Sequence, residues 1–147
     1  MKKYDVIIIG GGTAGCAAAY IAGISGLKVL LIEKNIHLGG TITSALVVPA
    51  MKCGEHQINT EFYEALVAEL NAIGGQATYL DNQGWFNPEL TKIALDNLMR
   101  KAAVEVFFDT HIQDVCIENK EIKSIKISKE ILSVYNESLQ EDEDVLS

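Results

Sequence analysis

The sequence has few basic residues, and this shortage excludes two large classes of partner. Twelve Lys and Arg stand against 20 Asp and Glu, which gives a formal net charge of -8 at pH 7. Nucleic acids and anionic membrane surfaces would repel such a chain, so we expect neither as a partner. A small anion held by local backbone groups remains compatible with this charge.

The sequence also lacks the pattern of a metal site or a disulfide framework. Its three cysteines, Cys16, Cys53 and Cys116, are odd in number and widely spaced, and its three histidines are scattered. We therefore expect no metal ion and reduced thiols in a cytoplasmic protein. We expect Cys16, which directly follows a glycine, to serve packing rather than reactivity.

A long continuous hydrophobic run is missing as well. Residues 6–27 carry no charge, but six glycines interrupt them and Asp5 precedes them. A signal peptide or a membrane span would need a longer unbroken apolar core. With 48% hydrophobic and 22% charged residues, the composition fits a soluble globular domain.

Local patterns predict a β-α-β unit at the N-terminus. Residues 4–9 form a β-branched run that ends at glycines, residues 13–24 are small and helix-compatible, and residues 28–32 resemble a second buried strand. A strand, a helix and a second strand within about thirty residues are typical of a parallel sheet.

Further helices and strands are predicted downstream. Helical spacing of apolar residues predicts helices over residues 59–73 and 87–101, the second with proline at its first helical position. Between them, residues 77–80 indicate a short strand and residues 82–84 a turn. Residues 104–108 indicate a third parallel strand.

The C-terminal part divides into two predicted regions. Two alternating runs within residues 111–128 surround a tight polar turn and predict a β-hairpin. Residues 129–147 become acidic and lose periodicity, which predicts a disordered tail. We therefore assign residues 1–128 to one domain, and the tail to no domain.

The glycine-rich segment at residues 10–15 lies between the first predicted strand and the first predicted helix, where a dinucleotide-binding loop belongs. Gly10 permits the tight turn, Gly12 lets the backbone approach a pyrophosphate, and Gly15 allows close packing of the helix on the strand. The helix N-terminus would stabilise the phosphate charge through its N–H groups and its dipole. The residues expected to hold the pyrophosphate are Gly10, Gly12, Thr13, Ala14 and Gly15.

Glu33 stands at the end of the second predicted strand, where a carboxylate would accept hydrogen bonds from the adenosine ribose. Its charge would reject a 2′-phosphate, which disfavours NADP. The glycine loop and Glu33 together leave NAD and FAD both open.

Glu33-Lys34 and the later Gly39-Gly40-Thr41, together with the glycine loop, resemble the FAD-binding domain of the glutathione-reductase-type flavoprotein superfamily. The resemblance covers residues 4–127 and favours FAD over NAD. It implies that Gly39, Gly40 and Thr41 lie near the flavin phosphate and ribityl chain, and that Ile112 is a candidate contact of the adenine. It also implies an α/β fold: a Rossmann-like parallel sheet with flanking helices and a β-hairpin or meander, as an incomplete FAD-binding domain.

The chain departs from that superfamily in two respects. Ile42 and Val47 stand around the positions where disulfide reductases carry redox cysteines, so dithiol chemistry is absent. The later strand that usually completes the FAD site, and any substrate domain, are also absent. We expect the FAD-binding part of a flavin-dependent oxidoreductase, without a catalytic side chain of its own. Two alternatives remain: a truncated, non-catalytic fragment that binds FAD weakly or not at all, and an NAD-binding domain.

Overall fold

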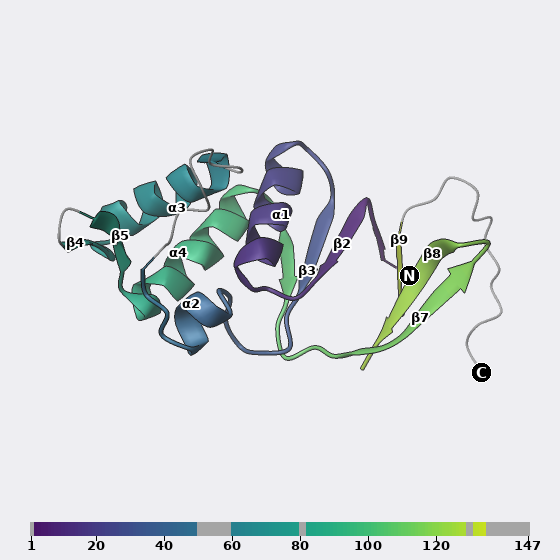
Figure 1. The fold of residues 1–147 in the computed structure, drawn as a ribbon. Helices are drawn as coiled ribbons and strands as arrows, with labels where there is room; N and C mark the ends of the chain where they lie inside the picture. The colour runs from purple at the N-terminus through teal and green to yellow at the C-terminus, as the bar shows by residue number, and fades with distance from the viewer. Residues whose placement is uncertain (1, 50–59, 80–81, 129–130, 135–147) are drawn as a thin grey trace.

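The protein forms three layers, and a small parallel sheet is the middle layer (Figure 1). The computed structural model describes residues 2–49, 60–79, 82–128 and 131–134. Strands β2 (Val6–Ile9), β3 (Val29–Ile32) and β6 (Glu105–Phe107) make the parallel sheet in the order β2-β3-β6. Helices cover one face of this sheet and an antiparallel sheet covers the other. The predicted α/β fold with a parallel sheet is therefore confirmed.

The predicted β-α-β unit is present at the N-terminus. Helix α1 (Thr13–Ile24) connects β2 to β3, and the two strands pair in parallel with Val6 opposite Val29. All four residues of β3 are buried, as expected of a strand covered on both faces. Gly10 leaves β2 with a φ of +100°, a backbone conformation that a side chain would strain.

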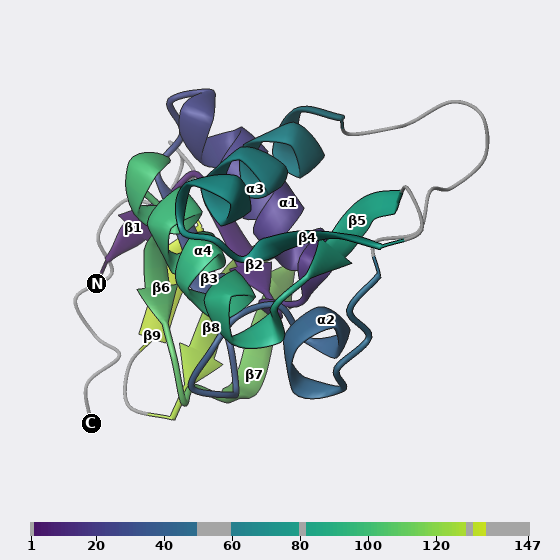
Figure 2. The same ribbon diagram turned by 90° about the vertical axis from the view of Figure 1, so that its left-hand side faces the viewer.

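The helical layer contains two longer amphipathic helices besides α1. Helix α3 (Thr60–Ala72) and helix α4 (Pro88–Lys101) lie within the limits predicted from their apolar spacing. The side chain of Asn87 caps α4, since its Oδ1 accepts hydrogen bonds from the backbone N–H groups of Glu89 (2.9 Å) and Leu90 (3.1 Å). Figure 2 shows α3 and α4 beside α1 on one side of the molecule.

Two short elements differ from the sequence prediction. Residues 82–84, predicted to be a turn, begin strand β5 (Asn82–Phe86), which pairs antiparallel with β4 (Gln76–Tyr79). The prediction was wrong because Asn82 pairs with Tyr79 across the two strands and Phe86 enters the core. Residues 41–44, for which the sequence predicted no helix, form the short helix α2 (Thr41–Ser44).

The antiparallel sheet on the opposite face has the strand order β1-β9-β8-β7. The predicted hairpin is present as β7 (Ile112–Glu118) and β8 (Glu121–Ile127). Strand β9 (Ile131–Val134) pairs with β8 and, in parallel, with β1 (Lys3–Tyr4).

Strand β9 lies inside the stretch that the sequence assigned to an acidic tail. The ordered domain therefore extends at least to Val134, beyond the boundary predicted at residue 128. Residues 131–134 were missed because their strand lies between β8 and β1, and β1 is distant in sequence. Residues 135–147, which include the acidic run, lie outside the described residues.

Strand β3 separates two hydrophobic cores. Val29 and Leu31 belong to the core under the helices, which also contains the buried Leu95 and Met99 of α4. Leu30 and Ile32 point to the opposite core, together with Tyr4, Ile125 and Ile127, which lie in the antiparallel sheet. The alternation of strand side chains explains why neighbouring residues serve different cores.

A buried carboxylate joins α3 to α4 and makes the stability of the fold dependent on pH. Glu69 forms an ion pair with Lys101, and its Oε1 accepts a hydrogen bond of 2.7 Å from Asn97 Nδ2. The hydrogen bond from Lys101 and, to a smaller degree, that from Asn97 hold the pKa of Glu69 below its usual value, although burial opposes them. Such a group stabilises the folded state above its unfolded pKa, near 4.5, and loses this contribution as the pH falls through the lower folded pKa.

We expect Glu69→Gln to flatten the acid dependence of stability. Thermal unfolding at pH 7 and at several values below pH 4.5 measures it, and the difference between variant and wild type should shrink as the pH falls. Glu89→Gln is the matched control, because Glu89 pairs with Lys92 on the exposed surface of α4. An unchanged difference across this range would contradict the role of the Glu69 charge.

Candidate cofactor-binding site

The glycine loop connects β2 to α1, and its backbone makes two close contacts. The N–H of Gly10 donates to the carbonyl of Ile32 over 2.7 Å, which ties the loop to the end of β3. A Cβ added at Gly15 would lie 1.8 Å from the carbonyl oxygen of Gly10. Gly15 is therefore required for the helix to pack on the loop, as its position in the sequence predicted.

Gly12 differs from Gly15 because nothing in the described structure crowds it. A Cβ built there meets no atom within 4 Å, and its φ of -69° suits any residue. Gly12 is the N-cap of α1, no side chain caps this helix end, and its first turn contains no acidic residue. Thr13 and Ala14 follow it on the surface. The open space at Gly12 therefore lies at the positive end of the α1 dipole, which would stabilise the negative charge of a phosphate.

The second glycine pair lies directly against the first loop. The N–H of Gly39 donates to the carbonyl of Gly11 over 2.8 Å, and Gly12 forms a parallel bridge with Gly39. A Cβ added at Gly40 would lie 3.0 Å from Cα of Gly12, and Gly40 has a positive φ of 55°. Two segments far apart in sequence therefore form one continuous strip of backbone at the start of α1, in which Gly12 and Gly40 are half-buried, and Thr41 is exposed beside it.

Glu33 reaches this strip from the end of β3. Its side chain is only 6% exposed, and its Oε2 accepts a hydrogen bond of 2.6 Å from the N–H of Gly11. Its Oε1 accepts two more, from the backbone N–H (2.8 Å) and the Nδ2 (2.7 Å) of Asn35. The carboxylate is thus fixed beside the glycine loop. Asn35 and Gly11 were not among the predicted site residues.

The passage from β6 to β7 lies beside Glu33. The N–H of Thr110 donates to the carbonyl of Glu33 over 3.2 Å, and the N–H of Asp109 donates to the carbonyl of Asn35 over 3.1 Å. The side chain of Ile112 packs on the core below the parallel sheet. Lys34 is exposed. The structure brings together the two glycine segments and Glu33, while Ile112 packs on the opposite core and no hydrogen bond among the described residues joins Lys34 to the glycine segments. Contacts of the predicted site residues with a cofactor stay a prediction.

Cys16 is a packing residue at the start of α1. It is fully buried, and its Sγ donates to the carbonyl of Gly11 over 3.2 Å. Burial above all, with smaller contributions from the charges of Glu33 and Asp96, raises the pKa of this thiol to about 12, and the backbone of Gly39 opposes the rise. The nucleophilic thiolate is therefore very scarce at neutral pH.

We expect iodoacetamide at pH 8 to modify the exposed Cys116 and to spare Cys16 in the folded protein. Peptide mapping by mass spectrometry measures the modification of each residue. The same reaction in denaturant, where Cys16 loses its burial, is the control. Equal labelling of both thiols in the folded state would contradict the packing role.

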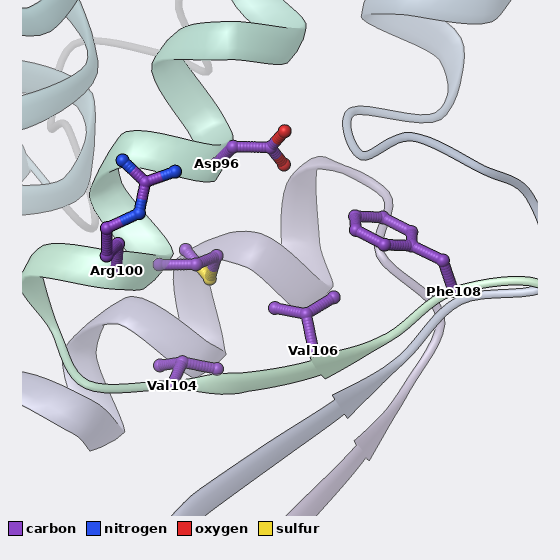
Figure 3. Close-up of a pocket in the computed structure, with 6 residues that line it drawn as sticks. Asp96, Arg100, Val104, Val106 and Phe108 are labelled. Atoms are coloured by element: carbon purple, nitrogen blue, oxygen red, sulfur yellow. The ribbon is translucent and has the colours of Figure 1, made fainter.

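A separate open pocket of about 290 Å³ lies between α4 and β6 (Figure 3). Asp96 and Arg100 of α4 stand above a floor that includes Val106 and Phe108. Burial raises the pKa of Asp96, while the charges of Arg100 and His37 oppose this rise. None of these residues was predicted to bind a cofactor.

The residues at the glycine loops fit a dinucleotide with a pyrophosphate. A Cβ at Gly12 meets no atom within 4 Å, the α1 N-terminus supplies positive potential that suits a phosphate, and the carboxylate of Glu33 is fixed beside the loop. Within the described residues, no group of three or more His, Cys, Asp or Glu side chains is arranged to hold a metal ion. No helix in the described part of the chain has the length and apolar character to cross a membrane.

Curated relatives match the N-terminal part of the chain. Cinnamate reductase of Clostridium sporogenes is 45% identical over 65 residues, which are 44% of this chain and 10% of that protein. Digeranylgeranylglycerophospholipid reductase 2 of Methanothermobacter thermautotrophicus is 51% identical over 43 residues, or 29% of this chain and 11% of that protein. The chain thus spans about a tenth of the length of these relatives.

Solved structures share the fold over most of the chain. L-proline dehydrogenase from P. horikoshii superposes with a TM-score of 0.67 at 16% identity, over 90% of this chain and 51% of that one. Glycine oxidase from Bacillus cereus gives a TM-score of 0.59 at 17% identity, over 89% of this chain and 53% of that one. The family model described as FAD dependent oxidoreductase matches residues 5–136. The chain therefore belongs to the FAD dependent oxidoreductase family, and its cofactor is FAD.

Proposed function

We propose that residues 10–15, Glu33 and residues 39–41 form the pyrophosphate- and ribose-binding part of an FAD site in an oxidoreductase. The observation that carries this proposal is the meeting of the two glycine segments at the start of α1, below the open space at Gly12. Bound FAD would supply the hydride or electron transfer. The residues of this chain bind and orient it.

The predicted residues fall into three groups in this proposal: pyrophosphate donors, a ribose acceptor, and residues around them. The N–H groups at Gly12, Thr13 and Ala14 donate to the pyrophosphate, where the α1 dipole offsets its charge. Glu33 accepts a hydrogen bond from the adenosine ribose. The two glycine segments and Glu33 together form what we call the cofactor cradle. The remaining predicted residues shape or flank this cradle: Gly10, Gly15, Lys34, Gly39, Gly40, Thr41 and Ile112.

We also propose that the whole protein is an oxidoreductase that acts on a small-molecule substrate in the cytoplasm. The chain spans about a tenth of its curated relatives and about half of the solved structures. The second candidate is a non-catalytic chain that binds FAD weakly or not at all, and the family match over residues 5–136 favours the first candidate.

Absorbance spectroscopy with nucleotide titration tests the proposal. The purified chain is titrated with FAD and, separately, with NAD. Flavin absorbance that stays with the protein, and preference for FAD over NAD, would support an FAD site. A colourless chain that binds neither nucleotide would instead favour the non-catalytic fragment, and preference for NAD would overturn the assignment.

We expect Glu33→Gln to weaken FAD binding by about 10- to 100-fold, the cost of losing a hydrogen bond to a charged group. We also expect the variant to discriminate less against nucleotides with a 2′-phosphate, because the repelling charge is gone. Fluorescence titration with FAD and with NADP measures both effects. Glu105→Gln is a control carboxylate on β6, where Lys2 and Tyr4 bind it. Unchanged FAD affinity in Glu33→Gln would contradict the role of Glu33.

A further inference from the structure

The hydrogen bonds around Glu33 are distributed unequally between its two oxygens. Oε1 accepts both donors of Asn35, the backbone N–H over 2.8 Å and Nδ2 over 2.7 Å. Oε2 accepts only the N–H of Gly11, over 2.6 Å, among the described residues. A carboxylate oxygen has two lone pairs, so Oε1 is saturated and Oε2 keeps one acceptor site.

The side-chain amide of Asn35 has a defined orientation in this arrangement. Its Nδ2 must face Oε1, because its own oxygen would repel the carboxylate. The carbonyl of Asn35 is also fixed, since it accepts the N–H of Asp109 over 3.1 Å. Asn35 is therefore tied to the carboxylate on one side and to the β6–β7 passage on the other.

We propose that Asn35 is a positioning residue for ribose recognition: it occupies Oε1 of Glu33, so that the carboxylate meets the ribose through Oε2 alone and takes a single hydroxyl. This inference rests on the proposed function, because it assumes that Glu33 faces the adenosine ribose. The glycine loop holds Oε2 toward the cofactor through the N–H of Gly11. Without the Asn35 amide, Oε1 has a free lone pair and the carboxylate can turn.

A series of three nucleotides separates this role from a general effect on folding. ADP carries the pyrophosphate and the adenosine ribose, and 2′-deoxy-ADP and 3′-deoxy-ADP each lack one hydroxyl. A single hydroxyl at Glu33 requires that one deoxy analogue bind the wild type about tenfold more weakly than ADP, while the other binds within about threefold of it.

We expect Asn35→Ala to weaken ADP binding by about tenfold and to reduce the discrimination between the two deoxy analogues. The backbone N–H of residue 35 still donates in this variant, which keeps the loop closed. Loss of structural integrity alone would weaken all three nucleotides equally. Asn35→Leu, of similar size but with neither a side-chain donor nor a charge, replaces Asn35→Ala if the latter fails to fold.

Asn97→Ala is the matched control. Asn97 Nδ2 donates to the buried carboxylate of Glu69 over the same 2.7 Å, between α3 and α4. This variant should lower the unfolding temperature and leave the dissociation constants of all three nucleotides unchanged. Isothermal titration calorimetry on the full chain measures each constant.

The outcomes are distinguishable. Wild-type chain that binds none of the three nucleotides overturns the proposed function and this inference with it. Wild-type binding of ADP together with equal losses for both deoxy analogues overturns the single-hydroxyl geometry alone. Unchanged discrimination in both Asn35 variants overturns the positioning role alone.

Discussion

A valine at position 12 is expected to abolish nucleotide binding while the fold stays intact. A Cβ at Gly12 meets no protein atom within 4 Å, and the φ of -69° and ψ of -179° are extended values that a β-branched residue adopts readily. The added methyl groups would occupy the space above the start of α1. We expect the dissociation constant for FAD to rise by at least about 100-fold, a cost close to 3 kcal/mol.

The stability of Gly12→Val and the FAD affinity of a smaller variant test this expectation further. The unfolding free energy should change by less than about 1 kcal/mol, the difference between glycine and valine as an N-cap. Gly12→Ala, with one carbon, should give an intermediate loss of FAD affinity. Undiminished FAD binding by Gly12→Val would remove the glycine loop from the cofactor site and overturn the proposed function.

Gly15→Ala is expected to act on the fold itself. The added Cβ would lie 1.8 Å from the carbonyl oxygen of Gly10, and neither atom can rotate away, because the backbone fixes the positions of both. Helix α1 would have to shift off the loop, which loosens its packing on β2 and β3. We expect a loss of about 3 kcal/mol or more in the free energy of unfolding, measured by urea denaturation.

Comparison with Gly12→Ala separates the two glycines. Both variants add one carbon to the same loop three residues apart, yet only Gly15→Ala should shift the urea midpoint. Equal stability of the two variants would show that the loop accommodates a side chain at Gly15, contrary to the close contact with Gly10.

Elements whose signals are local were predicted correctly from the sequence. The β-α-β unit follows from a buried strand, a small-residue helix and a second buried strand, each of which is visible within a few residues. Helix α4 carries its own start signal in Asn87 and Pro88. The hairpin turn at Asn119 and Lys120 has positive φ values of 51° and 66°, as a two-residue turn requires.

Elements that depend on distant partners were missed. Strand β9 forms because β8 and β1 lie on its two sides, and β1 lies more than one hundred residues away in sequence. Strand β5 pairs with the adjacent β4, but its Phe86 also joins a core that contains residues of α1, which are distant in sequence. Sequence patterns in a short window do not contain these contacts.

The glycines and the carboxylate of the candidate site were predicted from the sequence. The hydrogen bonds that hold these residues in place were not. Glycine spacing after a strand indicated the loop, and the structure adds that Gly39 bonds to Gly11. The donors to Glu33 were missed because an asparagine two residues later carries no signal until the loop geometry is known. The contacts between these residues and FAD stay a prediction.

The alternating side chains of β3 have a consequence for the cooperativity of the domain. Because Val29 and Leu31 serve one core while Leu30 and Ile32 serve the other, neither face can loosen without removing support from the opposite layer. The amide protons of β3 should therefore exchange with solvent only when the whole domain opens. Since the carbonyl of Ile32 anchors Gly10, the cofactor cradle is attached to the part of the molecule that opens last.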